Sequence, residues 1–213
     1  MDTEVENMKY HEIQAHKDPV ILLKHDMDHS QLLSMSQETK SKRLKIWNLP
    51  KLQLIQEIPI PREAVAFSRI GSQLCLGLKS GMIDFNDIMT TDSTELTFPS
   101  IVSQDLGTKC ESAEKRGMDQ TGDVVTTDAC SKQNIFLSCG GDNAIKIWDV
   151  FGSLLTEVVL DHTLTFACFL NDQGDILIGF KEHLFLIPHK KLMIDIEDAL
   201  SDDSVQATPN YRK

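Results

Sequence analysis

Two short segments of the chain, far apart in sequence, are nearly identical. Residues 44–48 read Leu-Lys-Ile-Trp-Asn and residues 145–149 read Ile-Lys-Ile-Trp-Asp. In both segments apolar and polar residues alternate, which predicts a β-strand that is buried on one face. Each is followed by a turn-like stretch and a second apolar strand, at residues 52–58 and 154–160. This internal repeat restricts the chain to an architecture made of repeated β-units.

Two weaker copies of the unit follow the same plan of strand, glycine-bearing turn and strand. They occupy residues 74–85 and 176–186. Phe85 follows Trp47 by 38 residues (85 − 47) and Leu186 follows Trp148 by 38 residues (186 − 148), so both are predicted to stand at the position of the tryptophan. A period of about 40 residues with four strands in each repeat is that of a propeller blade. We therefore predict an all-β fold, a partial β-propeller of about four four-stranded antiparallel blades.

One interval between the repeats is longer than the others. Phe85 and Trp148 are 63 residues apart (148 − 85), about 20 more than one period. The surplus lies in a polar stretch at about 88–117, which we interpret as a loop insertion, either disordered or functional. The predicted organisation is then a flexible N-terminus at 1–8, a propeller segment at 9–194 and an acidic C-terminal tail at 195–213.

Composition limits the classes of partner and compartment. The chain has 21 basic and 32 acidic residues and a net charge of -11, which disfavours nucleic acid and membrane surfaces as partners. Its five cysteines are scattered and form no CxxC pair, so we expect free thiols in a reducing, cytoplasmic compartment. The start of the chain is acidic and no apolar run reaches the length of a membrane helix. Other proteins are the expected partners.

The segment 137–149 resembles the WD-repeat family. In that family a hydroxyl residue, a histidine and an aspartate join the tryptophan in a buried hydrogen-bond network. The resemblance assigns these places to Ser138, Asp142 and Trp148, whereas Gln120 stands where the histidine is expected. The chemistry is sound without the family name, because a buried indole N–H needs an acceptor and a hydroxyl can supply one.

The resemblance extends over about residues 9–190. In the first repeat it assigns His16, Ser34 and Trp47 to the network, with Glu38 in a longer turn, and in the last repeat it assigns His162. The segment 179–184 is similar to the long WD-repeat proteins of cilia and sperm flagella. The full set of predicted network residues is His16, Ser34, Trp47, Gln120, Ser138, Asp142, Trp148 and His162.

The remaining polar clusters give few candidates for chemistry. The one basic cluster comprises Lys40, Lys42, Arg43 and Lys45, either a patch for an acidic partner such as a tubulin tail or a solvated turn. His25 and His29 are interpreted as part of a hairpin turn in preference to a zinc site. No nucleophile elbow, phosphate-binding loop or zinc-protease motif occurs. We therefore predict no catalytic, cofactor-binding or metal-binding residues, no cofactor and no enzymatic activity.

The resemblance implies a protein-interaction scaffold, in a larger assembly such as the axoneme of a cilium or flagellum. Four blades are fewer than a closed ring commonly contains, so we expect the chain to be part of a larger protein or to need further blades or another chain. An alternative function is substrate reception for a ubiquitin ligase, although the Trp-Asp-x-Arg signature of such receptors lacks its arginine at 148–151. A propeller hydrolase is a third possibility, for which no convergent acid, base and nucleophile is found.

Overall fold

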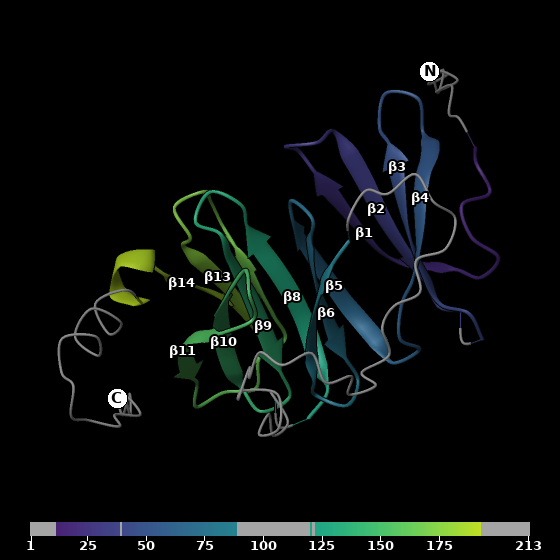
Figure 1. Ribbon diagram of the computed structural model, residues 1–213. Coiled ribbons are helices and arrows are strands. Elements are labelled where there is room, and N and C mark those ends of the chain that lie inside the picture. Colours follow the sequence, from purple (N-terminus) through teal and green to yellow (C-terminus); the bar gives the residue numbers. More distant parts are fainter. Residues whose placement is uncertain (1–11, 39, 89–119, 121, 193–213) are drawn as a thin grey trace, which may run out of the picture. The chain divides into compact units, whose positions relative to one another are not determined.

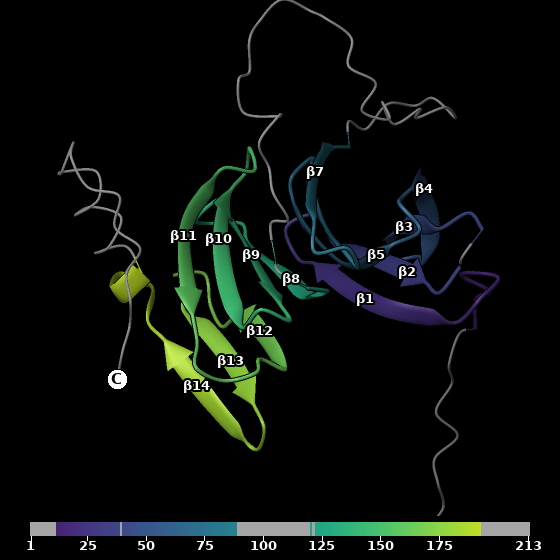
Figure 2. The same cartoon turned by 90° about the horizontal axis from the view of Figure 1, so that it is seen from below.

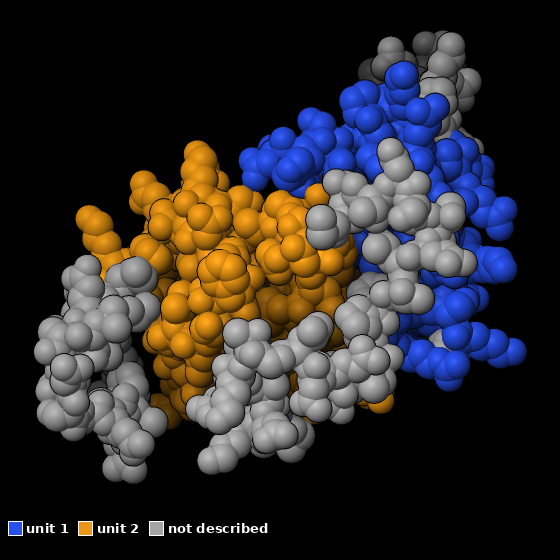
Figure 3. Space-filling model, in the orientation of Figure 1, with its two compact units in different colours: residues 1–62 blue, residues 63–213 orange. Residues whose placement is uncertain are grey.

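Four antiparallel β-sheets form the part of the chain that the computed structural model describes, residues 12–38, 40–88, 120 and 122–192. The chain divides into two compact units, residues 1–62 and 63–213, which Figure 3 shows in separate colours. The predicted all-β class is confirmed, and the sheets of three or four sequential strands have the organisation of a partial propeller. The predicted termini at 1–8 and 195–213, and nearly all of the insertion at 88–117, lie outside the described residues.

The first unit contains one four-stranded sheet. Its strands follow one another in space as they do in sequence, in the order β1 (Val20–Asp26), β2 (Gln31–Ser36), β3 (Arg43–Asn48) and β4 (Gln53–Pro59) (Figure 1). Leu44 and Ile46 are buried on one face of β3, while Trp47 lies on the other. The alternation seen in the sequence thus places neighbouring residues of β3 on opposite faces of the sheet.

The second unit contains three sheets. The first is β5 (Ala64–Ile70), β6 (Gln73–Leu78) and β7 (Ile83–Asp87). The second is β8 (Val124–Cys130), β9 (Ile135–Gly140), β10 (Ala144–Asp149) and β11 (Leu154–Val159). The third is β12 (Phe166–Phe169), β13 (Ile176–Phe180) and β14 (His183–Ile187), followed by one helical turn at 189–192. Within the described residues the first and third of these sheets therefore have three strands instead of the four predicted for a blade.

Neighbouring sheets of the second unit pack face to face through apolar side chains. Phe136 and Trp148 join a cluster with residues of the β5–β7 sheet, and Leu137 and Ile147 join one with the β12–β14 sheet. The ribbons of the β8–β11 and β12–β14 sheets lie side by side in Figure 2. The first two sheets approach closely at Gly77, where an added Cβ would lie 2.5 Å from Cγ1 of Val124. The β8–β11 sheet is therefore buried on both faces.

Two predicted equivalences with the tryptophan are wrong. Phe85 lies on the face of its sheet that packs against the following sheet, β8–β11. Trp148 lies on the face of its own sheet that packs against the preceding sheet, β5–β7. Leu186 is 53% exposed, and it is the next residue, Ile187, that packs against the core. Side chains of a strand alternate between faces, so a difference of one residue in a connection moves the aligned residue to the other face.

Candidate functional site

Three residues predicted to cooperate lie together inside the sheet of the first unit. The indole Nε1 of Trp47 on β3 donates a hydrogen bond of 2.8 Å to Oγ of Ser34 on β2. Nε2 of His16, from the segment before β1, lies 2.8 Å from the same oxygen. Because the serine oxygen accepts from the indole, its own proton is available for the imidazole. The network ties β2, β3 and the entry to β1 together.

Burial and nearby charges determine the protonation state of His16. Its pKa is lowered chiefly by burial and then by the nearby ammonium of Lys45, while Glu38 and Glu57 act in the opposite direction. The neutral ring that results accepts the serine proton at Nε2, and Nδ1 lies 4.0 Å from Oε1 of Glu38.

Ser34, His16 and Glu38 place a hydroxyl, an imidazole and a carboxylate next to one another, as in a catalytic triad. Ser34, however, is only 1% exposed and its oxygen already bonds the indole of Trp47. A substrate carbonyl has no route to that oxygen while the sheet is folded. The arrangement therefore holds strands together, and its geometry does not suit attack on a substrate.

The second unit contains a related network built on a different side chain. Nε1 of Trp148 on β10 donates to Oγ of Ser138 on β9 at 2.8 Å. The amide of Gln120 satisfies all its neighbours when Nε2 faces Asp142, at 2.7 and 2.9 Å from the carboxylate oxygens, and Oε1 accepts from Ser138 at 2.9 Å. A neutral glutamine thus reproduces the pattern of one acceptor and one donor that a histidine would supply.

Backbone contacts fix the position of Gln120, which is completely buried. Its N–H donates to the carbonyl oxygen of Gly81, in the turn between β6 and β7, at 2.8 Å. Gly81 has a φ of +86°, and an added Cβ would meet the carbonyl oxygens of Gln120 and Gly122, the second at 2.6 Å. Only glycine suits this position, because both the torsion angle and the space exclude a side chain.

The structure does not place His162 in a network of this kind. Its ring is exposed and stacks on Phe180, with centroids 4.5 Å apart and an angle of 15° between the planes. Ile178 and Ile187 lie on the face of β13 and β14 that carries the hydroxyl and the indole in the preceding sheet. Without that hydroxyl and that indole the imidazole loses its partners, and the aromatic contact replaces them.

The predicted basic patch is divided by the fold. Lys42 is 6% exposed, and burial lowers its pKa. Nζ of Lys45 lies 2.9 Å from Oε1 of Glu57, and Arg43 lies 3.7 Å from the other oxygen of the same carboxylate. Lys40 is exposed, and its carbonyl oxygen accepts from Arg62 at 3.4 Å. These four residues therefore do not form one exposed basic surface, since one is buried and two share a carboxylate.

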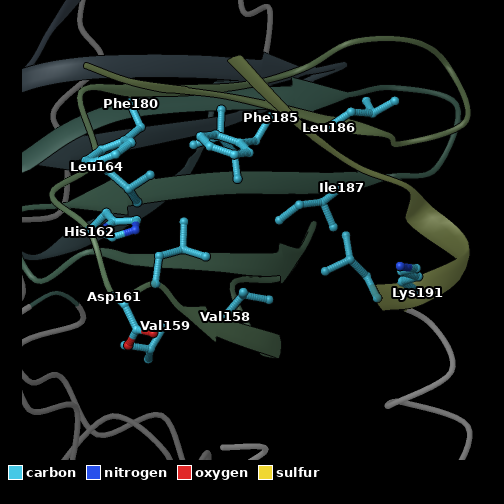
Figure 4. Close-up of a pocket in the computed structure, with 13 residues that line it drawn as sticks. Val158, Val159, Asp161, His162, Leu164, Phe180, Phe185, Leu186, Ile187 and Lys191 are labelled. Carbon is cyan, nitrogen blue, oxygen red and sulfur yellow. The ribbon is translucent and has the colours of Figure 1, made fainter. Parts of the chain in front are cut away.

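A cavity that the sequence did not reveal lies in the second unit. It has a volume of about 580 Å³ and is bounded by β11, the segment after it, β13, β14 and the helical turn (Figure 4). Most of its wall is apolar, and Asp161, His162 and Lys191 supply polar groups. The unbroken apolar run Phe185-Leu186-Ile187, which lines it, is the sequence signal that points to it.

Two thiols of the β8–β11 sheet are masked by burial. Burial raises the pKa of Cys139 to about 11, and it also raises the pKa of Cys130. At neutral pH both sulfurs are thus protonated and weakly nucleophilic.

The described ranges contain neither a metal-binding cluster nor a membrane-spanning helix. There, no group of three or more His, Cys, Asp or Glu side chains is placed to hold a metal ion. His29 instead contacts Asp26, with Nδ1 3.0 Å from Oδ2. No helix within the same ranges has the length and apolar character needed to cross a membrane.

Comparison with known proteins supports the fold alone. No protein-family model matches the chain. A chain in the crystal structure of the mitotic checkpoint complex is 16% identical with a TM-score of 0.54, over 81% of this chain and 48% of that one. The computationally designed Ika8 protein is 17% identical with a TM-score of 0.52, over 83% of this chain and 48% of that one. The chain thus spans about half the length of the solved chains that it matches.

Proposed function

We propose that this chain is a non-enzymatic protein-interaction scaffold of the WD-repeat type, which works in a larger intracellular assembly such as an axoneme. Two Ser–Trp networks support the WD-repeat assignment, since each joins the second and third strands of a four-stranded sheet. One structurally similar chain belongs to a structure described as a complex, the mitotic checkpoint complex, which supports a place in an assembly.

The observation that carries the proposal is an exposed aromatic residue on a rigid turn. Phe151 is 83% exposed between β10 and β11. The turn is held by Oδ1 of Asp149, which accepts from the backbone N–H of Phe151 at 2.9 Å and of Ser153 at 2.7 Å. A turn whose backbone is already fixed loses little entropy on binding, and aromatic side chains are enriched in protein interfaces.

Polar groups of the kinds used in catalysis have structural partners here. Ser34, His16 and Ser138 are buried and bond within the sheets, so we assign them to stability. The net charge of -11 favours proteins as partners over nucleic acid or membrane. Further blades, in a longer chain or in another one, complete the propeller in this proposal, since the chain matches only 48% of each similar structure.

Affinity purification with the full chain as bait, followed by mass spectrometry, tests the proposal. We expect a defined set of partners, and we expect Phe151→Ala to lower their recovery about tenfold, the effect of losing one interface anchor. Phe151→Tyr is the matched control and retains the partners. Axonemal proteins among the partners support the ciliary setting, whereas a ligase adaptor supports substrate reception. Equal recovery with Phe151→Ala contradicts the assignment of this turn as the binding site.

A further inference from the structure

We propose that the chain associates with a second copy of itself, and that the outer face of the last sheet of each copy packs on the Trp47 face of the other. The outer face carries the apolar side chains of Phe166, Leu177, Leu184 and Leu186. The Trp47 face is the side of the first sheet that carries Leu23, Leu32, Ser34, Lys45 and Trp47. The inference rests on the proposed function and deepens it, because it names the other chain that supplies further blades.

The outer face of the β12–β14 sheet is apolar and exposed. Leu184 pairs with Gly179 and thereby shares a face with Phe166, and the next row on the same face contains Leu186. The opposite face of this sheet, which includes Ile178, packs against β8–β11. Phe166, Leu184 and Leu186 are 51%, 73% and 53% exposed. These exposed fractions show that no neighbouring sheet in the described part of the chain covers them.

The equivalent positions in the two preceding sheets are buried. Ile83 on β7 occupies the place of Leu184; it is 3% exposed and belongs to a cluster with Trp148 of the following sheet. Ile145 on β10 occupies the same place; it is fully buried and belongs to a cluster with Ile178 of the following sheet. In this unit, the face that carries these residues is thus the one that the next sheet covers.

The Trp47 face carries the same groups as the face of β8–β11 that packs on β5–β7. On each, a tryptophan donates to a serine at 2.8 Å. Each also has a lysine paired with a glutamate of the fourth strand, at 2.9 Å for Lys45 and at 3.5 Å for Lys146. A face of this composition accepts the apolar face of a preceding sheet, as Trp148 accepts Ile83 in the second unit.

The Trp47 face lacks the cover that its counterpart has. Leu23 lies beside the serine of this face, where Thr127 lies in β8–β11. Thr127 is fully buried, whereas Leu23 is 56% exposed. Leu32 is only half-buried, whereas Phe136 at the equivalent position is fully buried. Apolar side chains are thus exposed where a preceding sheet would cover them.

A second copy suits both faces at once, because each copy has one of each kind. The chain corresponds to 48% of each of two similar solved chains, so two copies span about the length of one such chain. In a two-fold pair the contact between the two different faces forms twice, which leaves neither face exposed.

Charge does not oppose this contact locally, although each copy has a net charge of -11. The four side chains that define the outer face are uncharged, and Lys45 on the Trp47 face is neutralised by Glu57. Association therefore removes the exposed leucines from water without burying an unpaired charge.

Sedimentation velocity of the full chain over a range of concentrations tests the proposal. We expect a species with the mass of two chains of 24.0 kDa. Leu184→Asp and Leu23→Asp should each raise the dissociation constant of this species about thirtyfold, the effect of losing a central interface residue. Met27→Asp is the matched control: Met27 is 79% exposed on the turn between β1 and β2, so this substitution should leave the constant unchanged. If the Leu184→Asp chain fails to fold, Leu184→Ser removes the apolar contact without adding a charge.

Mixing the two variants tests whether two different faces meet. In a pair of one Leu184→Asp chain and one Leu23→Asp chain, one of the two contacts joins unchanged faces, so the mixture should recover two-chain species that neither variant forms alone. A parent chain that stays monomeric overturns the proposal, and so do species that grow beyond two copies. Dissociation by Leu184→Asp but not by Leu23→Asp also overturns it, because the outer face then packs on itself. Phe151→Ala should leave the pair intact, so this result is independent of partner recovery.

Discussion

The ring of Phe85 packs against the indole of Trp148, with centroids 5.9 Å apart and an angle of 56° between the planes. Phe85 also meets Phe136 edge-on at 5.6 Å. Gly152 leaves room for this ring, since a Cβ there would lie 2.7 Å from it. The two residues that the repeat spacing equated are thus partners across the contact between β5–β7 and β8–β11.

Removing this ring should weaken the contact between the two sheets. We expect Phe85→Ala to lower the free energy of unfolding by about 2 kcal/mol, less than for a fully buried phenylalanine because Phe85 is partly exposed. Chemical denaturation measures the change. The same substitution at Phe151, which is exposed and has no ring partner among the described residues, should cost less than about 0.5 kcal/mol. Equal losses would contradict the packing described here.

Loss of the Ser138 hydroxyl should leave the buried indole N–H of Trp148 without an acceptor. Ser138→Ala leaves Nε1 of Trp148 and the amide of Gln120 without their shared partner, so a loss of about 1–3 kcal/mol is expected. In a double-mutant cycle, Trp148→Phe should cost less in the Ser138→Ala background than in the parent, since the donor no longer needs an acceptor. Ser153→Ala on the exposed turn serves as the control. Strictly additive losses would refute the coupling.

Acid should destabilise the protein through His16. Its folded pKa lies below the ordinary 6.5, so in this range the unfolded state binds the proton more readily than the folded state. Stability is therefore retained above pH 6.5 and falls as the pH drops from there toward the folded pKa. The slope cannot exceed about 1.4 kcal/mol per pH unit, the limit for one proton.

A glutamine at the same position separates the hydrogen bond from the titration. Because Gln120 fills the corresponding place in the other network, His16→Gln should preserve most of the stability at pH 7.5 and flatten its dependence on pH. His25→Gln, the same change at an exposed histidine of β1, provides the comparison. Denaturation curves at several pH values measure both. A slope that survives in His16→Gln would assign the effect to another group.

The turn at Gly81 should tolerate no side chain. Gly81→Ala brings a Cβ against the carbonyl oxygens of Gln120 and Gly122 and imposes a φ of +86° on alanine, so we expect a loss of about 2–3 kcal/mol. Thermal unfolding is a sufficient measurement. Gly141→Ala, where the nearest atom would lie 3.9 Å away, should change stability little. If the two variants behave alike, the contact with Gln120 does not constrain the turn.

Sequence reasoning succeeded where a short pattern determines both strand and face. Trp47 and Trp148 each lie on the third strand of a four-stranded sheet, as predicted. The alternation of apolar and polar residues around each tryptophan is that of a strand with one buried face. The resemblance to WD repeats also pointed to His16 and Gln120, and the structure places both beside the serine hydroxyl.

Features that depend on connections between strands were beyond the sequence. Phe85 and Leu186 were assigned to the wrong face because the length of a turn is uncertain by one residue, and one residue reverses the face. Burial of Lys42 depends on how the turn before β3 folds, which a run of basic residues does not indicate. The cavity is lined by residues of β11, β13 and β14 together, so it depends on how two sheets pack and not on any one segment of the sequence.

The reactivity of the buried thiol of Cys139 can be used to measure local opening of the structure. The sulfur is fully buried between the last two sheets, so a maleimide can reach it only when those sheets separate; burial also raises its pKa to about 11. The rate at which Cys139 is alkylated therefore measures how often the contact between the β8–β11 and β12–β14 sheets opens.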